Sequence, residues 1–366
     1  MVFLITFEAM FKYKETIIAF SLILQIVLVK FIGANPEFIE TYYSNGLYQF
    51  TSKLLRYAFG WLPFSFGDLF YAFSIIYIVR WLAKNRGRFT KDTKRWFAEA
   101  FSFIAIIYFA FHIFWGMNYY RLPLNESLNL EKEYTTEQLV DITKRLITKT
   151  NAIHLQITND DSLKVEMPYK KGKMLKMAPN GFEVLEQEYP HLKYEPRSVK
   201  KSMFSLPLTY MGFSGYLNPL TNEAHLDAMI PAYKFPTTTC HEIAHQLGYA
   251  AENEANFIGC LASINNEDIY FVYSGYAFAL RHCVNEIYNR DPELFKALVE
   301  TINKGVRNNY KEVHEFWERY QNPTEPIFKY TYNAFLEANA QEGGMESYSY
   351  VVALIVNYFD DKLKYE

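Results

Sequence analysis

The 366-residue chain has few cysteines and no excess of positive charge. Its three cysteines, Cys240, Cys260 and Cys283, are an odd number, which argues against a framework of disulfide bonds. Each falls in an apolar helical pattern, so we expect buried free thiols. The formal net charge of −3 and the scattered lysines leave no basic patch for nucleic acid. No internal repeat or low-complexity segment is evident.

Long apolar runs are missing from most of the chain but crowd its first 120 residues. Runs at 16–33, 61–82 and 97–117 each approach the roughly 20 residues that cross a bilayer. Tryptophans stand near the ends of these runs, where interfacial anchors are common: Trp61, Trp81, Trp96 and Trp115. No small-residue cleavage site follows the first run, as a cleaved signal peptide would require. We therefore expect residues 1–120 to form a membrane domain with three transmembrane helices in the lipid bilayer.

Basic residues predict the orientation of this membrane domain. The segment between the second and third runs contains six of them: Lys84, Arg86, Arg88, Lys91, Lys94 and Arg95. By the positive-inside rule this segment and the N-terminus are cytoplasmic. Residues 121–366 are then expected outside the inner membrane, in the periplasm, as one domain of ordinary size. Asp68 and His112 lie near the ends of the runs, where we expect their side chains to reach the interface.

The segment His241-Glu242-Ile243-Ala244-His245 predicts a metal site. Residues four apart on a helix share a face, so both imidazoles can bind one ion. Two imidazoles, a carboxylate and an open position for water suit catalytic Zn²⁺. Glu242 can then act as general base on that water. The alternative is a pair of core histidines, but the motif has helix context, with Thr237-Thr238-Thr239 as expected N-cap hydroxyls and Gly248 at the expected C-terminus.

Two carboxylates, Glu252 and Glu254, follow the motif closely enough to supply the third ligand. The segment Glu252-x-x-Ala255-Asn256 resembles the second-helix motif of gluzincin metallopeptidases. That resemblance implies that Glu252 binds zinc and that Asn256 supports a ligand histidine. Metzincins place a third histidine in H-E-x-x-H-x-x-G-x-x-H, but Ala251 occupies that position here, so this family does not fit.

Three segments together resemble a family of uncharacterised bacterial membrane proteins with a zincin-like active site. They are 115–121 (WGMNYYR), 239–249 (TCHEIAHQLGY) and 342–348 (EGGMESY). The resemblance covers nearly the whole chain and implies a membrane-anchored zinc peptidase of undefined substrate. With it, the expected fold is an α-helical transmembrane region followed by an α+β, mainly helical zincin-like metallopeptidase domain.

Residues 121–366 show further elements by pattern. Thr135 to Gln138 predicts a capping box that opens a helix. Zincin-like folds have an edge strand just before the motif helix that aligns a peptide substrate, so the resemblance implies such a strand at residues 223–230. Late helices are expected at 270–288, 292–303, 311–320 and 348–361.

These observations predict a zinc-dependent metallohydrolase, most consistent with a peptidase that acts on peptide or protein substrates of the cell envelope. Zinc would be bound by His241, His245 and Glu252, with Glu242 as the catalytic base. Candidate donors to the tetrahedral oxyanion are Tyr332, Tyr348, His225 and Arg281. The rival interpretation is a catalytically silent zinc-containing sensor or scaffold, against which the intact Glu242 argues, because a structural site needs no general base. The sequence does not specify an oligomeric state.

Overall fold

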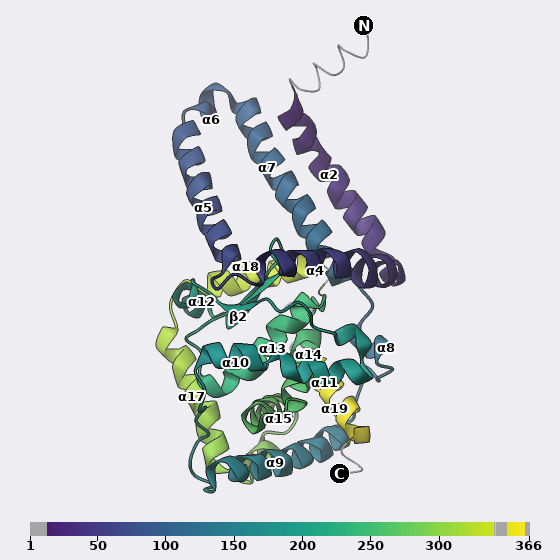
Figure 1. The fold of residues 1–366 in the computed structure, drawn as a ribbon, viewed down its shortest axis with the longest axis vertical. Coiled ribbons are helices and arrows are strands. Elements are labelled where there is room, and N and C mark those ends of the chain that lie inside the picture. The colour runs from purple at the N-terminus through teal and green to yellow at the C-terminus, as the bar shows by residue number, and fades with distance from the viewer. Residues whose placement is uncertain (1–12, 340, 342–349, 363–366) are drawn as a thin grey trace.

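Three long apolar helices rise from a larger, mainly helical domain in the computed structural model, which describes residues 13–339, 341 and 350–362 (Figure 1). They are α2 (Lys14–Gly33), α5 (Phe66–Asn85) and α7 (Thr93–Phe114). Their lengths of 20, 20 and 22 residues and their composition would allow each to cross a membrane. The expected class of fold is therefore confirmed: apolar N-terminal helices, then a helical domain with a small sheet.

The second apolar helix begins later than the sequence predicted. Its first turn is closed by Ser65, whose hydroxyl accepts a hydrogen bond from the amide of Asp68, so α5 begins at Phe66 rather than at Trp61. Asp68 does not reach a membrane interface. It is fully buried and accepts hydrogen bonds from the domain, from the amide of Met203 and from the hydroxyl of Tyr216.

The connections between the three helices lie at their two opposite ends. At one end, α3 (Pro36–Phe38), a π-helical segment η1 (Ile39–Leu47) and α4 (Tyr48–Phe59) link α2 to α5. Helix α4 lies across the foot of the three helices, against the domain (Figure 1). At the other end, α6 (Arg88–Lys91) joins α5 to α7, on the same side as the N-terminal end of α2. The basic segment and the domain are thus at opposite ends of the apolar helices.

The domain is built around the helices that follow the sheet. A 3-10 segment η2 (Gly116–Tyr120) leads into it from α7. Its helices are α8 (Leu124–Ser127), α9 (Thr136–Thr158), α10 (Lys171–Met177), α11 (Pro179–Glu188), α12 (Ser205–Met211), α13 (Phe235–Gln246), α14 (Glu252–Ile264), α15 (Ile269–Arg290), α16 (Pro292–Glu300), α17 (Lys304–Tyr320), α18 (Glu325–Ala338) and α19 (Tyr350–Lys362), with short 3-10 turns η3 (Pro190–Leu192) and η4 (Ala232–Lys234). The buried core packs α13, α14 and α15 together, and all three cysteines are free and buried in it, as expected.

Several predicted elements are confirmed and others are displaced. The capping box exists: the hydroxyl of Thr135 accepts from the amide of Gln138, whose side chain accepts from the amide of Thr135. Helix α17 begins seven residues before the expected start at 311, and α18 was not predicted. The last predicted helix is described from Tyr350 onward.

The sheet has three short strands in the order β1 (Val199–Lys201), β3 (Glu223–Leu226), β2 (Gly215–Asn218). β3 pairs with β1 in parallel and with β2 antiparallel. The prediction of an edge strand at 223–230 was therefore wrong, because β3 is central and its four residues are all buried. Its carboxylate, Glu223, is satisfied inside by the ammonium of Lys200 and by the amide of Gly67. The edge strand that lies against the motif helix is β2.

Candidate metal centre

The motif helix α13 begins earlier than its hydroxyl residues suggested. Its first turn contains Phe235 and Pro236, whose fixed φ and missing amide hydrogen suit that position. The predicted N-cap at Thr237–Thr239 was wrong. The hydroxyls of Thr238 and Thr239 donate to main-chain carbonyls four residues earlier, so these residues lie within the helix.

Two glycines bring the second helix of the site against α13. Gly248 has φ +94°, a left-handed conformation that reverses the chain, as predicted. Helix α14 then packs closely across α13, where a Cβ on Gly259 would lie 2.7 Å from the amide nitrogen of His241. Any larger residue there would push the two helices apart. The close crossing places Glu252, in the first turn of α14, opposite the two histidines.

The side chains of His241, His245 and Glu252 converge. One ligand atom of each lies within 4.8 Å of the others. Nε2 of His241 is 3.3 Å from Oε2 of Glu252, and Nε2 of His245 is 3.7 Å from Oε1. Two donors at about 2.1 Å from one tetrahedral ion stand about 3.4 Å apart. The separations and the imidazole–carboxylate donor set therefore fit a zinc ion.

Glu254 points to another part of the molecule. Its carboxylate accepts a hydrogen bond of 2.6 Å from the amide of Leu124. Burial raises the pKa of Glu254 to about 7, although that hydrogen bond and the charge of Arg121 oppose the shift. Of the two acidic residues that the sequence offered as the third ligand, only Glu252 lies beside the histidines.

The histidines differ in how their second ring nitrogen is held. Nδ1 of His245 lies 2.7 Å from the carbonyl oxygen of Tyr249. A carbonyl can only accept, so Nδ1 carries the proton and the lone pair of Nε2 faces the site. Nδ1 of His241 is buried without a partner among the described residues, and so is the side-chain nitrogen Nδ2 of Asn256. The predicted support of a histidine by Asn256 is not present there.

A tyrosine from the unpredicted helix α18 completes the surroundings of the acidic ligand candidate. The hydroxyl of Tyr332 donates a 2.5 Å hydrogen bond to Oε1 of Glu252. The ring of Tyr332 also packs edge-on against Phe213, which precedes β2. Tyr332 had been a candidate oxyanion donor, and the structure instead gives it a contact with the acidic member of the group.

The structure describes the surroundings of two of the other three candidate oxyanion donors. His225 is fully buried, with Nε2 2.7 Å from the hydroxyl of Ser65 at the start of α5. Arg281 lies on α15. Burial, the larger cause, and the charge of Arg281 lower the pKa of Lys234 to about 8. Tyr348 lies outside the described residues.

The electrostatics of the group distinguish its two glutamates. Burial raises the pKa of Glu242 to about 8, and Oε2 of this carboxylate has no hydrogen-bond partner in the part of the chain that the structure describes. For Glu252, burial would raise the pKa, but the hydrogen bond from His241 and the charges of both histidines lower it to about 2. Burial and the neighbouring His241 lower the pKa of His245 to about 4. Thus Glu252 is held as an anion, and Glu242 is a buried carboxyl with one oxygen that has no hydrogen-bond partner among the described residues.

Residues from the first third of the chain hold the C-terminal end of the motif helix α13, which we call the metal helix. The indole of Trp115 donates to the carbonyl of His245 at 3.2 Å, and the hydroxyl of Tyr48 donates to that of Gln246 at 2.8 Å. Arg121 donates to the carbonyl of Gly248 at 3.0 Å and forms a two-pronged ion pair with Glu40. The sequence predicted that Trp115 is an interfacial anchor. That prediction was wrong, because Trp115 is buried. Sequence reasoning missed all three contacts, although 115–121 was one of the segments behind the family resemblance.

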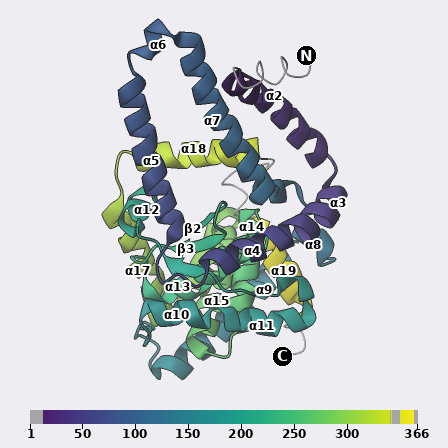
Figure 2. The same cartoon turned by 45° about the horizontal axis from the view of Figure 1, so that its top comes forward.

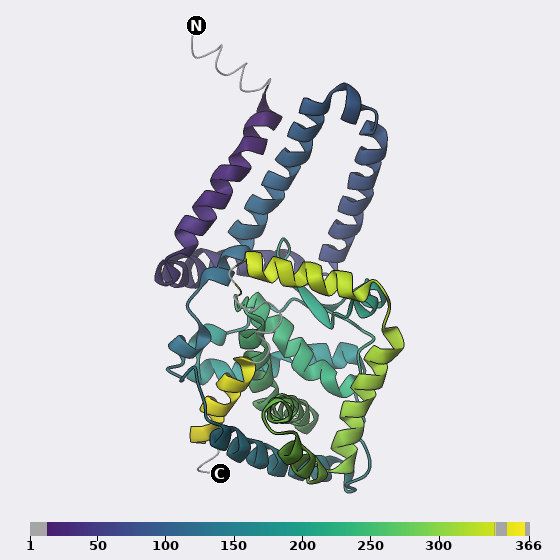
Figure 3. The ribbon, with the colours of Figure 1, turned by 180° about the vertical axis from the view of Figure 1, so that it is seen from behind.

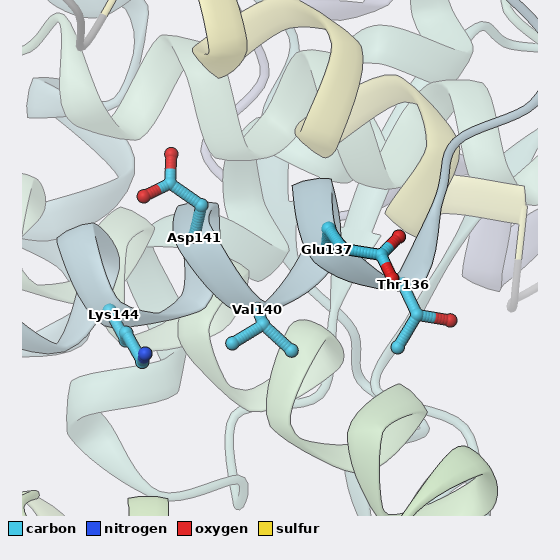
Figure 4. Close-up of a pocket in the computed structure, with 5 residues that line it drawn as sticks. All are labelled: Thr136, Glu137, Val140, Asp141 and Lys144. Carbon is cyan, nitrogen blue, oxygen red and sulfur yellow. The ribbon is translucent and has the colours of Figure 1, made fainter.

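A surface hollow far from this group offers no comparable chemistry. It is lined by side chains of α9 alone, namely Thr136, Glu137, Val140, Asp141 and Lys144 (Figure 4). Helix α9 lies at the end of the domain that is remote from the apolar helices (Figure 1). One of its acidic groups, Asp141, is already paired with Arg145 at 2.6 Å.

Comparison with known proteins places the chain in a family. Residues 43–356 match the model of DUF3810, described as a protein of unknown function, and the chain belongs to this family. No curated protein and no solved structure shows a significant match. The family description carries no activity, so the chemistry must be argued from the group of side chains itself.

Proposed function

We propose that this protein is a membrane-anchored, zinc-dependent metallohydrolase that cleaves peptide bonds. The observation that carries the proposal is the convergence of His241, His245 and Glu252 within 4.8 Å, beside a buried carboxylate oxygen of Glu242 that has no partner among the described residues. A structural zinc site closes its fourth position with another protein ligand and has no use for such a carboxylate. The arrangement therefore favours a hydrolase over the rival sensor or scaffold.

The ligand roles follow from the contacts. His241, His245 and Glu252 would hold the zinc, which when bound supplies a Lewis acid that polarises a carbonyl and lowers the pKa of water. The carbonyl of Tyr249 fixes the ring of His245, and the hydroxyl of Tyr332 orients the carboxylate of Glu252. Both contacts reduce the freedom of the ligand set before substrate binds.

Glu242 would perform the proton transfers. It follows His241 directly, and its carboxylate lies against Gly215 of the edge strand β2, where a Cβ would be 2.5 Å from Oε1. A peptide paired with the free edge of β2 would therefore pass this carboxylate. Glu242 would accept a proton from the attacking water and later deliver it to the leaving amine.

The proposed location is the inner membrane, with the domain on the extracytoplasmic side. Three helices could span the bilayer. Their basic connection around α6 lies at the end away from the domain (Figure 1). By the positive-inside rule that end would be cytoplasmic, which puts the metal centre in the cell envelope.

The experiment compares purified full-length protein with its Glu242→Gln variant. Both are expected to carry about one zinc per chain by elemental analysis, and a double His241→Ala, His245→Ala variant none. Peptide hydrolysis in the cell envelope, read by sequencing new N-termini, should fall about 10²–10⁴-fold in Glu242→Gln, because a general base is lost. Glu293→Gln, on the exposed surface of α16, is the matched control.

Two results would contradict the proposal. Full zinc occupancy in the double alanine variant would remove the ligand assignment. Stoichiometric zinc in the wild-type protein with no difference in envelope peptides between wild type and Glu242→Gln would instead favour the sensor or scaffold.

A further inference from the structure

The metal centre lies at the very end of a membrane-spanning helix. Trp115 directly follows the last residue of α7, and its indole holds the carbonyl of His245. The ring centroids of Trp115 and His245 are 6.1 Å apart. One side chain therefore separates a metal ligand from the point where α7 leaves the apolar zone.

Helix α4 presents an exposed apolar face beside the site. Phe50, Leu54 and Tyr57 are 67%, 56% and 68% exposed, and their spacing of four and three residues puts them on one face. Tyr48, fully buried on the same helix, holds the carbonyl of Gln246 in the metal helix. A helix is about 10 Å across. The metal helix thus lies about one helix diameter from an apolar face fit for the bilayer interface.

An apolar groove opens between α5 and α7 immediately above the domain. Helix α2 packs along α7, whereas α5 stands apart from both in every view (Figures 1, 2 and 3). A cavity of about 330 Å³ lies between α5 and α7 and is lined mainly by aromatic residues, namely Phe66, Leu69, Phe70, Phe73, Ser74, Tyr77 and Phe103. The groove begins at the first residue of α5. The hydroxyls of Ser74 and Tyr77 are the polar groups of this lining and the rest of it is apolar, so an apolar occupant fits it.

Strand β2 joins the foot of this groove to the catalytic carboxylate. At one end, a Cβ on Gly67 in the first turn of α5 would lie 2.5 Å from the side-chain nitrogen of Asn218. At the other end, Gly215 lies against Glu242. These two residues of β2 are three positions apart, or about 10 Å along a strand. A chain that left the groove and followed the free edge of β2 would reach Glu242 after three or four residues.

We propose that the substrates are polypeptides anchored in the same membrane by an N-terminal transmembrane helix, which docks in the groove between α5 and α7. The inference rests on the proposed peptidase function and adds its substrate class. β2 runs from Glu242 toward α5, so a chain that leaves the membrane and runs toward Glu242 pairs with it antiparallel, the more stable arrangement. The bond cleaved lies within about five residues of the membrane. Water supplies a hydroxyl to its carbonyl carbon and a hydrogen to its nitrogen, which releases the outer part of the substrate.

The experiment uses full-length protein in liposomes with two forms of one degenerate ten-residue peptide library. One form is free in solution, and the other follows the C-terminus of a 20-residue Leu-Ala transmembrane helix. We expect wild type to cleave the anchored form at least tenfold faster, with cuts clustered in the first five residues after the helix. A ten-residue Gly-Ser spacer between helix and library should abolish this advantage.

Paired variants test the groove. Phe73→Trp, which narrows the groove, should reduce cleavage of the anchored library about tenfold and leave the free library unchanged. Ile75→Trp, on another face of α5 and similarly exposed, should change neither. Equal cleavage of free and anchored libraries, cuts independent of distance from the membrane, or identical behaviour of the two variants would overturn the inference while leaving the peptidase intact. If neither library is cleaved faster by wild type than by Glu242→Gln, the proposed function fails and the inference fails with it.

Discussion

A graded loss of zinc affinity should follow from three conservative substitutions around the metal centre. Glu252→Gln removes a carboxylate whose oxygens lie 3.3 and 3.7 Å from the two histidines. Tyr332→Phe removes only the hydroxyl that donates to this carboxylate. Glu254→Gln changes a neighbouring carboxyl that faces the amide of Leu124 instead. The three variants are nearly equal in size, so differences between them report on chemistry and not on packing.

The structure gives the order of the three effects. Loss of a group that supports a metal ligand typically costs 10–100-fold in affinity, which is the expected result for Tyr332→Phe. Glu252→Gln must exceed that range, because a neutral amide replaces an anionic ligand of a divalent ion. Glu254→Gln should leave affinity within about threefold of wild type, since its side chain lies outside the group. Burial already raises the pKa of this carboxyl to about 7, so a neutral amide resembles its protonated form.

Competition with a fluorescent zinc chelator measures all three variants in detergent at pH 7.5. Circular dichroism of each variant with excess zinc checks that the fold is retained. Loss of zinc in Glu254→Gln with retention in Glu252→Gln would refute the ligand assignment. Unchanged affinity in Tyr332→Phe would refute the argument that α18 holds the acidic ligand in place.

Three further predictions concern topology, support of the metal helix and acid stability. A reporter that is active only in the cytoplasm should be silent at the C-terminus and active when inserted at 84–95, and the reverse pattern would mean that the orientation is inverted. Trp115→Phe removes the indole donor to the carbonyl of His245, which keeps a hydrogen bond from the amide of Gly248, and should lower the free energy of unfolding by about 0.5–1.5 kcal/mol. An unchanged denaturation midpoint would show that the contact contributes no stability. Burial lowers the pKa of His225 to about 4, so between pH 6.5 and 4 the unfolded chain binds a proton that the folded chain does not, and stability should fall as the pH falls through this range. Thermal unfolding at several pH values should show a shallower slope for His225→Gln than for wild type, and equal slopes for His225→Gln and the exposed control His314→Gln would contradict the assignment.

The two helices of the candidate metal site could be predicted from the sequence because their signals are local. His241 and His245 are one helical turn apart, and the left-handed turn at Gly248 has a residue type that suits it. The three apolar helices were equally local, since length and composition alone identify them. In each case the residues that define the element are also the residues that reveal it.

The elements that were misread depend on distant partners. Strand β3 was expected at an edge because zincin-like folds have an edge strand before the motif helix. It is central here, and its Glu223 is paired with Lys200 and with the first turn of α5, the latter more than 150 residues earlier in the chain. Trp115 follows an apolar run and so resembled an interfacial anchor, whereas its partner is the metal helix. Helix α18 buries only one side chain fully, Leu336, so its apolar pattern gave little indication of a helix. Contacts between residues so far apart in the sequence produce no periodic pattern in either segment, so the sequence pattern does not reveal them.

The anchoring of the metal helix by Tyr48, Trp115 and Arg121 has a consequence for how the protein is made. All three residues leave the ribosome more than 100 residues before His241 does, and they lie at the foot of the apolar helices. Their partners are the carbonyls of His245 and Gln246, the last two residues of α13, and of Gly248 in the turn that follows. Each of these hydrogen bonds contributes about 0.5–1.5 kcal/mol. The C-terminal end of α13 therefore gains its full set of contacts only when the earlier segments are in place. If the apolar helices are inserted in a membrane, as we propose, assembly of the candidate metal site would follow that insertion, and a chain that failed to insert would lack these supports of α13.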